Sequence, residues 1–154
     1  MNKKEQFIHI DDDGNKRYFS DRKMTTRHRE DGPAIECASG RKSWYINGKL
    51  HREDGPAIES VDGSKQWYIN GELHREDGPA IEYADGYNVW HINGKRHRED
   101  GPAIEYASGY KAWYLNGKLL TEEEFNARMK PIELTLDEIA EKFGVSVEQL
   151  KIKK

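Results

Sequence analysis

The sequence has one cysteine, few apolar residues and no long apolar run. A single cysteine, Cys37, excludes an internal disulfide and a zinc site made of four thiolates. A signal peptide is excluded by the polar N-terminal sequence MNKKEQFIHIDDDG, and no stretch of about 18 consecutive apolar residues is present to cross a membrane. We therefore expect a soluble, cytoplasmic protein.

Neither sign of charge is in large excess. The 154 residues include 25 Lys and Arg against 28 Asp and Glu, for a net charge of -3. This balance argues against a surface that binds nucleic acid or acidic lipid, and we expect neither a nucleic-acid nor a membrane partner. Only 35% of residues are apolar, and four Trp and eight Tyr supply much of that apolar area, as a thin sheet requires.

The chain repeats itself every 23 residues. The nine residues HREDGPAIE begin at His28, His51, His74 and His97. Each copy is followed by a tryptophan, at Trp44, Trp67, Trp90 and Trp113, and then by an Asn-Gly pair. A fixed period of this length is typical of repeat architectures, in which each unit buries its apolar face only against its neighbours.

Two turns are predicted in each unit. The pair Asn47-Gly48 between Ile46 and Lys49 predicts a two-residue hairpin of type I′, because both central positions need positive φ. The other turn ends in glycine, as in Ala38-Ser39-Gly40, and predicts a three-residue loop with a left-handed Gly.

The three-residue loop sets a register that the side chains support. It places glutamates opposite lysines in the pairs Glu36–Lys42, Glu59–Lys65 and Glu105–Lys111. It also places tyrosines opposite tyrosines, in the pairs Tyr83–Tyr87 and Tyr106–Tyr110. Shifting the loop by one residue loses both sets of pairs together.

These turns predict a mainly β fold: a single-layer antiparallel sheet of repeated β-hairpins, with about ten strands. An odd number of strands per unit would reverse the direction of successive units, so we expect one hairpin and a connecting loop per repeat. Residues 1–120 form this array. Residues 1–27 are a degenerate N-terminal unit, since Asp13-Gly14 precedes Tyr18 as Asp62-Gly63 precedes Trp67.

The unit resembles the MORN repeat. A strand, a turn ending in Gly, a Trp-centred strand, an N-G-K turn and a loop ending in Gly carry the resemblance over residues 7–119. It is closest to MORN variants of bacteria and phages, some of which carry an antitoxin label. The chain departs from the family at HREDGPA, where MORN units usually have Gly-x-Gly. The resemblance implies a binding or scaffolding role, in some members at membranes.

Residues 121–154 predict a helical C-terminal cap. Thr121 to Glu124 and Thr135 to Glu138 are capping boxes that begin short helices, and Gly144 ends the second of them. We expect two or three short helices to close the end of the sheet. The tail LDEIAEKFGVSVEQLKI also resembles a helix-turn-helix, so a DNA-binding regulator is an alternative, although the segment has more acidic than basic residues.

The HRED loops favour a structural reading. Four identical copies at equivalent positions predict a ladder in which Arg and Glu of adjacent loops alternate, with Asp-Gly-Pro fixing the turn into the next strand. A row of weak metal sites is the alternative; we expect no metal and no cofactor. Cys37 replaces the tyrosine of later units and has no distinct His partner, so we do not expect a nucleophile.

The units differ from one another at one informative place. Across the Asn-Gly turn a Tyr faces a Leu in three units, whereas His91 faces Arg96 in the third full unit. The register places this pair on the face that also carries four tyrosines. We therefore predict a partner-binding site there: Tyr83, Tyr87, His91, Arg96, Tyr106 and Tyr110. Drift in a solvated patch is the alternative.

Three functions follow from these features. The first is a non-enzymatic module that binds a protein partner through one face of the sheet. The second is a phage counter-defence protein, acting in the host cytoplasm, that binds a host defence protein or sequesters a small anionic or nucleotide-like ligand. The third is the DNA-binding regulator. We expect no enzyme, because no nucleophile, base and orienting group can be assembled from residues that are not repeated.

Overall fold

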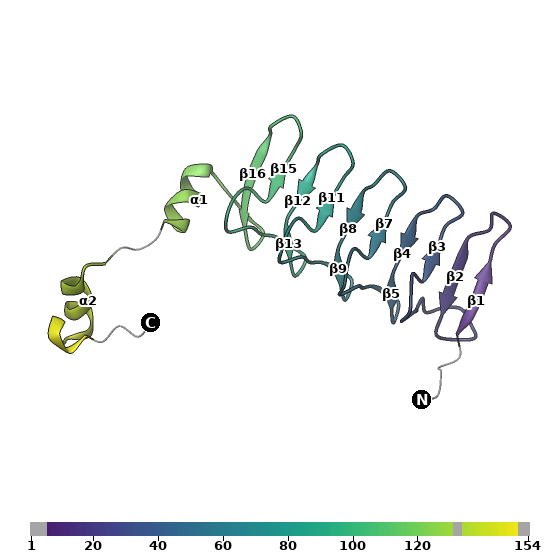
Figure 1. The fold of residues 1–154 in the computed structure, drawn as a ribbon, viewed down its shortest axis with the longest axis horizontal. Coiled ribbons are helices and arrows are strands. Elements are labelled where there is room, and N and C mark those ends of the chain that lie inside the picture. The colour runs from purple at the N-terminus through teal and green to yellow at the C-terminus, as the bar shows by residue number, and fades with distance from the viewer. Residues whose placement is uncertain (1–5, 131–133, 151–154) are drawn as a thin grey trace.

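The computed structural model describes residues 6–130 and 134–150. It shows a long, open antiparallel sheet of short strands followed by helices (Figure 1). The prediction of a mainly β, single-layer sheet of repeated hairpins with a short helical C-terminal segment is confirmed.

Eleven strands form the main sheet, and their spatial order follows the chain. In that order they are β1 (Phe7–Ile10), β2 (Lys16–Phe19), β3 (Ile35–Glu36), β4 (Lys42–Ser43), β7 (Ile58–Glu59), β8 (Lys65–Gln66), β11 (Ile81–Glu82), β12 (Asn88–Val89), β15 (Ile104–Glu105), β16 (Lys111–Leu115) and β17 (Lys118–Leu120). Each full unit contributes one hairpin to this sheet, and the hairpins of successive units pair with each other.

A second row of small hairpins lies beside the main sheet. Its strands are β5 (Tyr45–Ile46) with β6 (Lys49–Leu50), β9 (Tyr68–Ile69) with β10 (Glu72–Leu73), and β13 (His91–Ile92) with β14 (Lys95–Arg96). The sequence predicts only one hairpin per unit, so this second row is a difference. Consecutive small hairpins are also joined, since the Gly71 amide donates to the Leu50 carbonyl at 2.8 Å.

The tryptophan is where each unit divides into two hairpins. The Trp44 amide donates to the Ala57 carbonyl of the next unit at 2.8 Å, whereas the Trp44 carbonyl accepts from the His51 amide of the small hairpin at 3.1 Å. Trp67 and Trp90 make the equivalent bonds. Because the two bonds of one residue go to different partners, the strand pairing changes at this point.

The predicted turns and registers are confirmed. Asn47 and Gly48 have φ of 50° and 78°, as the type I′ turn requires, and Gly40 has φ of 96° in its three-residue loop. The Cys37 amide donates to the Arg41 carbonyl at 2.9 Å and closes that loop. The three Glu–Lys pairs lie opposite each other as expected.

The N-terminal segment forms the first hairpin of the main sheet. Its strands β1 and β2 join through a turn that ends at Gly14, whose amide donates to the Asp11 carbonyl at 2.9 Å. Tyr18 takes the place of the tryptophan, because the guanidinium of Arg29 lies 4.1 Å from its ring centroid. The longer connection is held by Asp21, which accepts the amides of Thr25 and Thr26.

The single layer has two faces. The loop face carries the HREDG loops and the tryptophans beneath them. The tyrosine face carries the residues that alternate with these, among them Tyr87, Val89 and His91. Burial is limited, as the low apolar content predicts: Val89, Ile104 and Ala112 form a small core cluster on the tyrosine face. The alanine of each HREDGPA copy is fully buried (Ala34, Ala57, Ala80 and Ala103).

Two helices and a 3₁₀ turn follow the sheet: α1 (Glu122–Met129), α2 (Leu136–Phe143) and η1 (Val147–Gln149). Both predicted capping boxes are present, and Gly144 ends α2 in the left-handed conformation. The sequence also predicts that the first helix ends at Pro131, which lies outside the described residues. No helix in the described part of the chain is long and apolar enough to cross a membrane.

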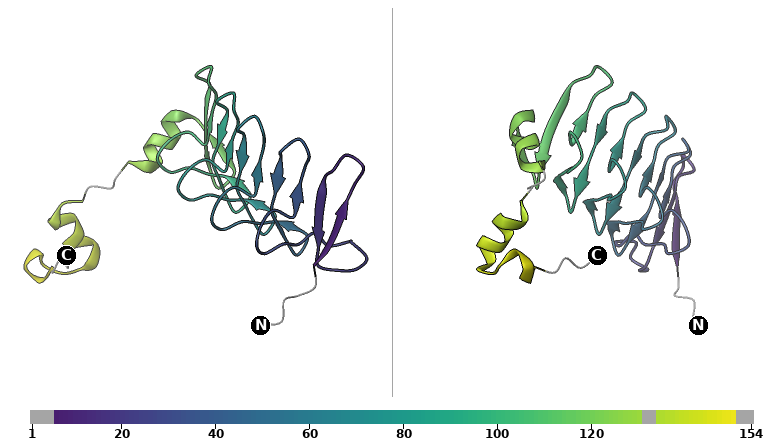
Figure 2. Two further views of the ribbon diagram at one scale, coloured as in Figure 1. Left: turned by 45° about the vertical axis from the view of Figure 1, so that its right-hand side comes forward. Right: turned by 60° about the vertical axis from the view of Figure 1, so that its left-hand side comes forward.

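Among the helices that the structure describes, only α1 covers the end of the sheet. It packs against β16 and β17 and buries Phe125. The views of Figure 2 show α2 standing away from the strands, and Leu136 and Phe143 on α2 are exposed. The expectation that all the C-terminal helices close the sheet is therefore wrong for α2, because its Leu136 and Phe143 side chains do not pack against the strands.

Candidate functional site

One arginine organises each HREDG loop. The Arg75 side chain donates from Nε to Asp77 at 2.9 Å and from Nη1 to the Pro79 carbonyl at 3.2 Å and to Glu82 at 2.6 Å. Its guanidinium lies 4.0 Å from the ring centroid of Trp67, a cation–π contact. The same set of bonds and a ring contact recur at the other three loop arginines: Arg29, Arg52 and Arg98.

The predicted ladder between adjacent loops is wrong in its pairing. Among the described residues, the ion pairs of each loop arginine go to the Asp and the strand Glu of its own unit, not to the Glu of a neighbouring loop. The cation–π contact explains this choice of partner. Because the guanidinium of Arg75 stacks on Trp67, it points toward the strand that follows the Arg75 loop, which carries Glu82. Glu82 therefore lies opposite Lys65 in the register but forms its ion pair with Arg75.

Glycine and histidine complete the loop. A Cβ on Gly78 would lie 2.9 Å from Cζ of Arg75, so any other residue would displace the guanidinium. The histidine joins the loop to the Asn-Gly turn of its own unit, since Nδ1 of His51 accepts the Asn70 amide at 3.1 Å. This bond leaves the proton on Nε2, which lies 3.6 Å from Glu53. The motif is therefore explained by local structure.

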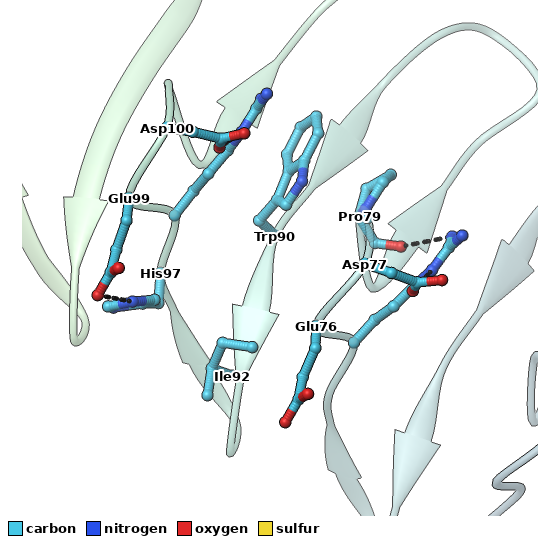
Figure 3. A pocket seen from close by; sticks show the side chains of 11 residues that line it. Glu76, Asp77, Pro79, Trp90, Ile92, His97, Glu99 and Asp100 are labelled. Carbon is cyan, nitrogen blue, oxygen red and sulfur yellow. Dashed lines mark hydrogen bonds and ion pairs between the residues drawn. The ribbon is translucent and has the colours of Figure 1, made fainter. Parts of the chain in front are cut away.

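Open grooves lie between successive loops on this face. One of them, of about 900 Å³, runs between the loops of Arg75 and Arg98 and has Trp90 and Ile92 at its floor (Figure 3). Equivalent grooves lie over Trp44 and Trp67. No group of three or more His, Cys, Asp or Glu within the described ranges is placed to hold a metal ion. The arginines and histidines around the grooves already bond to other groups of the protein. The grooves are therefore a weaker candidate for a binding site than the tyrosine face.

A continuous strip of aromatic rings crosses the tyrosine face. Tyr83 stacks on Tyr87 with ring centroids 5.7 Å apart, and Tyr87 lies 4.4 Å from Tyr106 of the next unit. Tyr106 meets Tyr110 edge-on at 5.5 Å. The exposed fractions of Tyr83, Tyr106 and Tyr110 are 40%, 45% and 60%. The four predicted tyrosines therefore form one connected surface; we call it the tyrosine strip.

Arg96 lies beside the tyrosine strip and is exposed. Its guanidinium lies 5.3 Å from the ring centroid of Tyr114, and Nη1 is 3.5 Å from the Tyr114 hydroxyl. Its charge also acts on the hydroxyl of Tyr87. Tyr114 was not among the predicted residues. The signal for it was available, because Tyr114 pairs with Leu119 as His91 pairs with Arg96.

His91 differs from expectation because it is buried, with an exposed fraction of 8%. Its Nδ1 has no hydrogen-bond partner in the part of the chain that the structure describes. Burial, together with the nearby charge of Arg96, lowers the pKa of His91. His91 therefore lies under the surface that Arg96 and the tyrosines present.

The two faces differ in charge. On the tyrosine face of the four full units, the positions that pair across each hairpin include two arginines, Arg41 and Arg96. Outside the turns, these positions include no carboxylate. The strand glutamates and the loop acids lie on the other face. Burial raises the pKa of Tyr68, and the positive charge of Arg41 opposes that rise. The tyrosine face is thus aromatic and basic, and the loop face is rich in carboxylates.

No protein-family model matches this chain, and the search of curated proteins finds no significant match. The candidate site is the tyrosine strip together with Arg96. Its tyrosine pairs follow from the predicted register, whereas the contact between Tyr87 and Tyr106 of neighbouring units and the burial of His91 do not.

Restoring the sequence of the other units at His91 should stabilise the fold in acid. Because the native pKa of His91 is lowered, the unfolded chain binds more protons as pH falls through about 6.5, and stability falls with it. In His91→Tyr this contribution to the pH dependence disappears. We expect the melting temperature of the variant to fall less between pH 7.5 and pH 5 than that of the wild type, which calorimetric scans at both pH values measure. Equal falls would contradict a buried, neutral His91.

Proposed function

We propose that this protein is a non-enzymatic binding module, a MORN-like repeat array that recognises a protein partner through its tyrosine strip and Arg96. The single observation that carries the proposal is the strip itself. Tyrosine and arginine are the residues most enriched where protein interfaces derive their binding energy. Four tyrosine rings in an unbroken row, three of them exposed, form such a surface.

The strip is suited to binding because its rings are already held in place. Each ring packs against the next, so little side-chain entropy remains to be lost when a partner arrives. The rings also lie on a sheet whose register is fixed by paired strands on both sides. A surface of this kind offers apolar area and hydroxyl groups together.

The charge of the face supports an acidic partner surface. Arg96 is exposed beside the strip, and no carboxylate occupies the paired positions around it. An arginine in this setting can take a carboxylate through two parallel hydrogen bonds. Complementary charge would also select against partners with basic surfaces. Cys37, the one cysteine, is free, which fits a cytoplasmic setting.

Site-specific photocrosslinking tests the proposal. A photoreactive phenylalanine analogue at Tyr110 should form an adduct with one protein in a lysate of the native host, and excess unlabelled wild-type protein should suppress the adduct. Val61, 70% exposed at a turn tip, is the matched control position and should give no such adduct. The same adduct from Val61, or an adduct from Glu76 on the loop face but not from Tyr110, would contradict the assignment of the binding face.

A further inference from the structure

The two ends of the main sheet differ in whether another element covers the edge strand. At the C-terminal end, α1 packs against β16 and β17. At the other end, β1 is the outermost strand of the described chain, and Ile8 and Ile10 are 50% and 59% exposed. Edge strands usually carry a charge or a proline that discourages pairing with another strand. The sequence of β1, Phe-Ile-His-Ile, has no proline and no carboxylate, lysine or arginine.

The hydrogen-bonding groups that β1 leaves free can be identified from the ladder. The Asp11 amide donates to the Asn15 carbonyl, and the Tyr18 amide points the other way, to the carbonyl of Ala34, the residue before β3. Ile8 lies opposite Tyr18, so Ile8 and Ile10 form the pairs that are not hydrogen-bonded to β2. The amides and carbonyls of Ile8 and Ile10 therefore point outward from the edge.

We propose that β1 pairs with β1 of a second copy of this chain, antiparallel, about a two-fold axis at His9. In this register Ile8 of each copy lies opposite Ile10 of the other, and the outward groups of both residues are satisfied by four hydrogen bonds. The result is a closed dimer with one sheet continuous across both copies. The loop faces of the two copies then adjoin on the same side of that sheet.

The side chains fit a self-pairing strand. Ile8 and Ile10 share the loop face with Tyr18, so the axis brings four isoleucines together on one side. On the other side His9 meets His9 of the partner subunit. Charge does not oppose the contact, because the neighbouring Arg17 is paired with Asp11 at 2.7 Å. At the axis, therefore, no unpaired Lys, Arg, Asp or Glu side chain of one subunit faces the same side chain of the partner subunit.

The size of the contact sets its strength. Two strands of four residues bury less than the roughly 1,600 Å² of a standard stable interface. We therefore expect a weak, concentration-dependent dimer. The prediction is independent of the tyrosine strip, which lies three to four units away along the sheet from β1.

Sedimentation velocity over a range from micromolar to several hundred micromolar tests the dimer. The wild type should shift from monomer to dimer across this range. The double variant Ile8→Lys/Ile10→Lys should stay monomeric, because it brings four ammonium groups together, while the control Val61→Lys should behave as wild type. Circular dichroism and melting curves check that each variant is folded. A wild type that stays monomeric throughout, or a dimer that survives the double variant, overturns the proposal.

Disulfide trapping tests the register without relying on a charged variant. With Cys37→Ser as background, His9→Cys places two thiols across the axis in a non-hydrogen-bonded pair, with Cα atoms about 4.5 Å apart, within disulfide reach. Under mild oxidation His9→Cys should become a covalent dimer, whereas Ile8→Cys, which faces Ile10 of the partner subunit, should not. Equal crosslinking of both, or of neither, overturns the two-fold register at His9.

Discussion

Replacing Trp67 by Ala should lower the free energy of unfolding by about 3 kcal/mol. The indole is covered by the guanidinium of Arg75, 4.0 Å from its centroid, and Trp67 is also the residue at which strand pairing changes between the two hairpins of its unit. Removing the ring leaves a cavity and leaves the arginine without its stacking surface. Urea denaturation followed by tryptophan fluorescence, which the other three tryptophans still report, measures the change.

A double-mutant cycle isolates the stack from the rest of the loss. Arg75→Met keeps the apolar stem but removes the guanidinium, and its coupling with Trp67→Ala should be about 0.5–1 kcal/mol. Arg75→Met should itself be destabilising, because Glu82 and the Pro79 carbonyl each lose a donor. An unchanged midpoint for Trp67→Ala would contradict the packing described for every repeat.

The hairpins of the main sheet are predictable from sequence because their determinants are local. Gly40 needs positive φ, and the Glu36–Lys42 pair fixes the register of the hairpin whose loop ends at Gly40. The second row of hairpins was not predicted because the backbone bonds of Trp44 go to two different partners, His51 and Ala57, both in the next HREDGPA copy. The residue pattern of one unit does not show which carbonyl group a backbone amide will bond to.

The ion pairs of the HREDG loops could be predicted only in part from the sequence. The repeated Arg, Asp and Glu correctly indicate ion pairs, but the choice of partner depends on the ring beneath Arg75. The Trp67-to-Arg75 spacing of eight residues is constant in the sequence, and it was the signal available for this contact. The role of Gly78 follows only once the guanidinium has been placed, because the steric conflict is with that side chain.

The candidate site was predicted in outline. The register gave the Tyr83–Tyr87 and Tyr106–Tyr110 pairs, and the structure joins them through Tyr87 and Tyr106. The burial of His91 was not predictable in this way. A register says which face a side chain is on, whereas its depth depends on the sizes of the side chains in neighbouring units. Arg96, at the end of a small hairpin, is exposed as expected.

The largest expected effect on function comes from restoring the repeat's own residues beside the tyrosine strip. The double variant His91→Tyr/Arg96→Leu should bind the partner roughly 30-fold more weakly, which corresponds to about 2 kcal/mol for the loss of one arginine hot spot. The fold should be kept, because the Tyr–Leu pair is the one used by the other three units. It should also be more stable, since it removes a buried nitrogen that has no hydrogen-bond partner among the described residues.

Two further variants locate the effect on the face. Tyr110→Ala removes an exposed ring of the strip and should weaken binding while leaving the core cluster intact. Tyr45→Ala, on the same face two units away, is the matched control and should bind as the wild type does. Loss of binding in both would indicate a footprint that extends along the whole face.

Isothermal titration calorimetry of the crosslinked partner, purified and titrated into the wild-type and His91→Tyr/Arg96→Leu proteins, tests the central claim most directly. Binding through the tyrosine strip and Arg96 predicts a folded double variant, at least as stable as the wild type, whose dissociation constant is raised roughly 30-fold. An unchanged dissociation constant in a folded double variant would contradict it and would move the binding site away from Arg96.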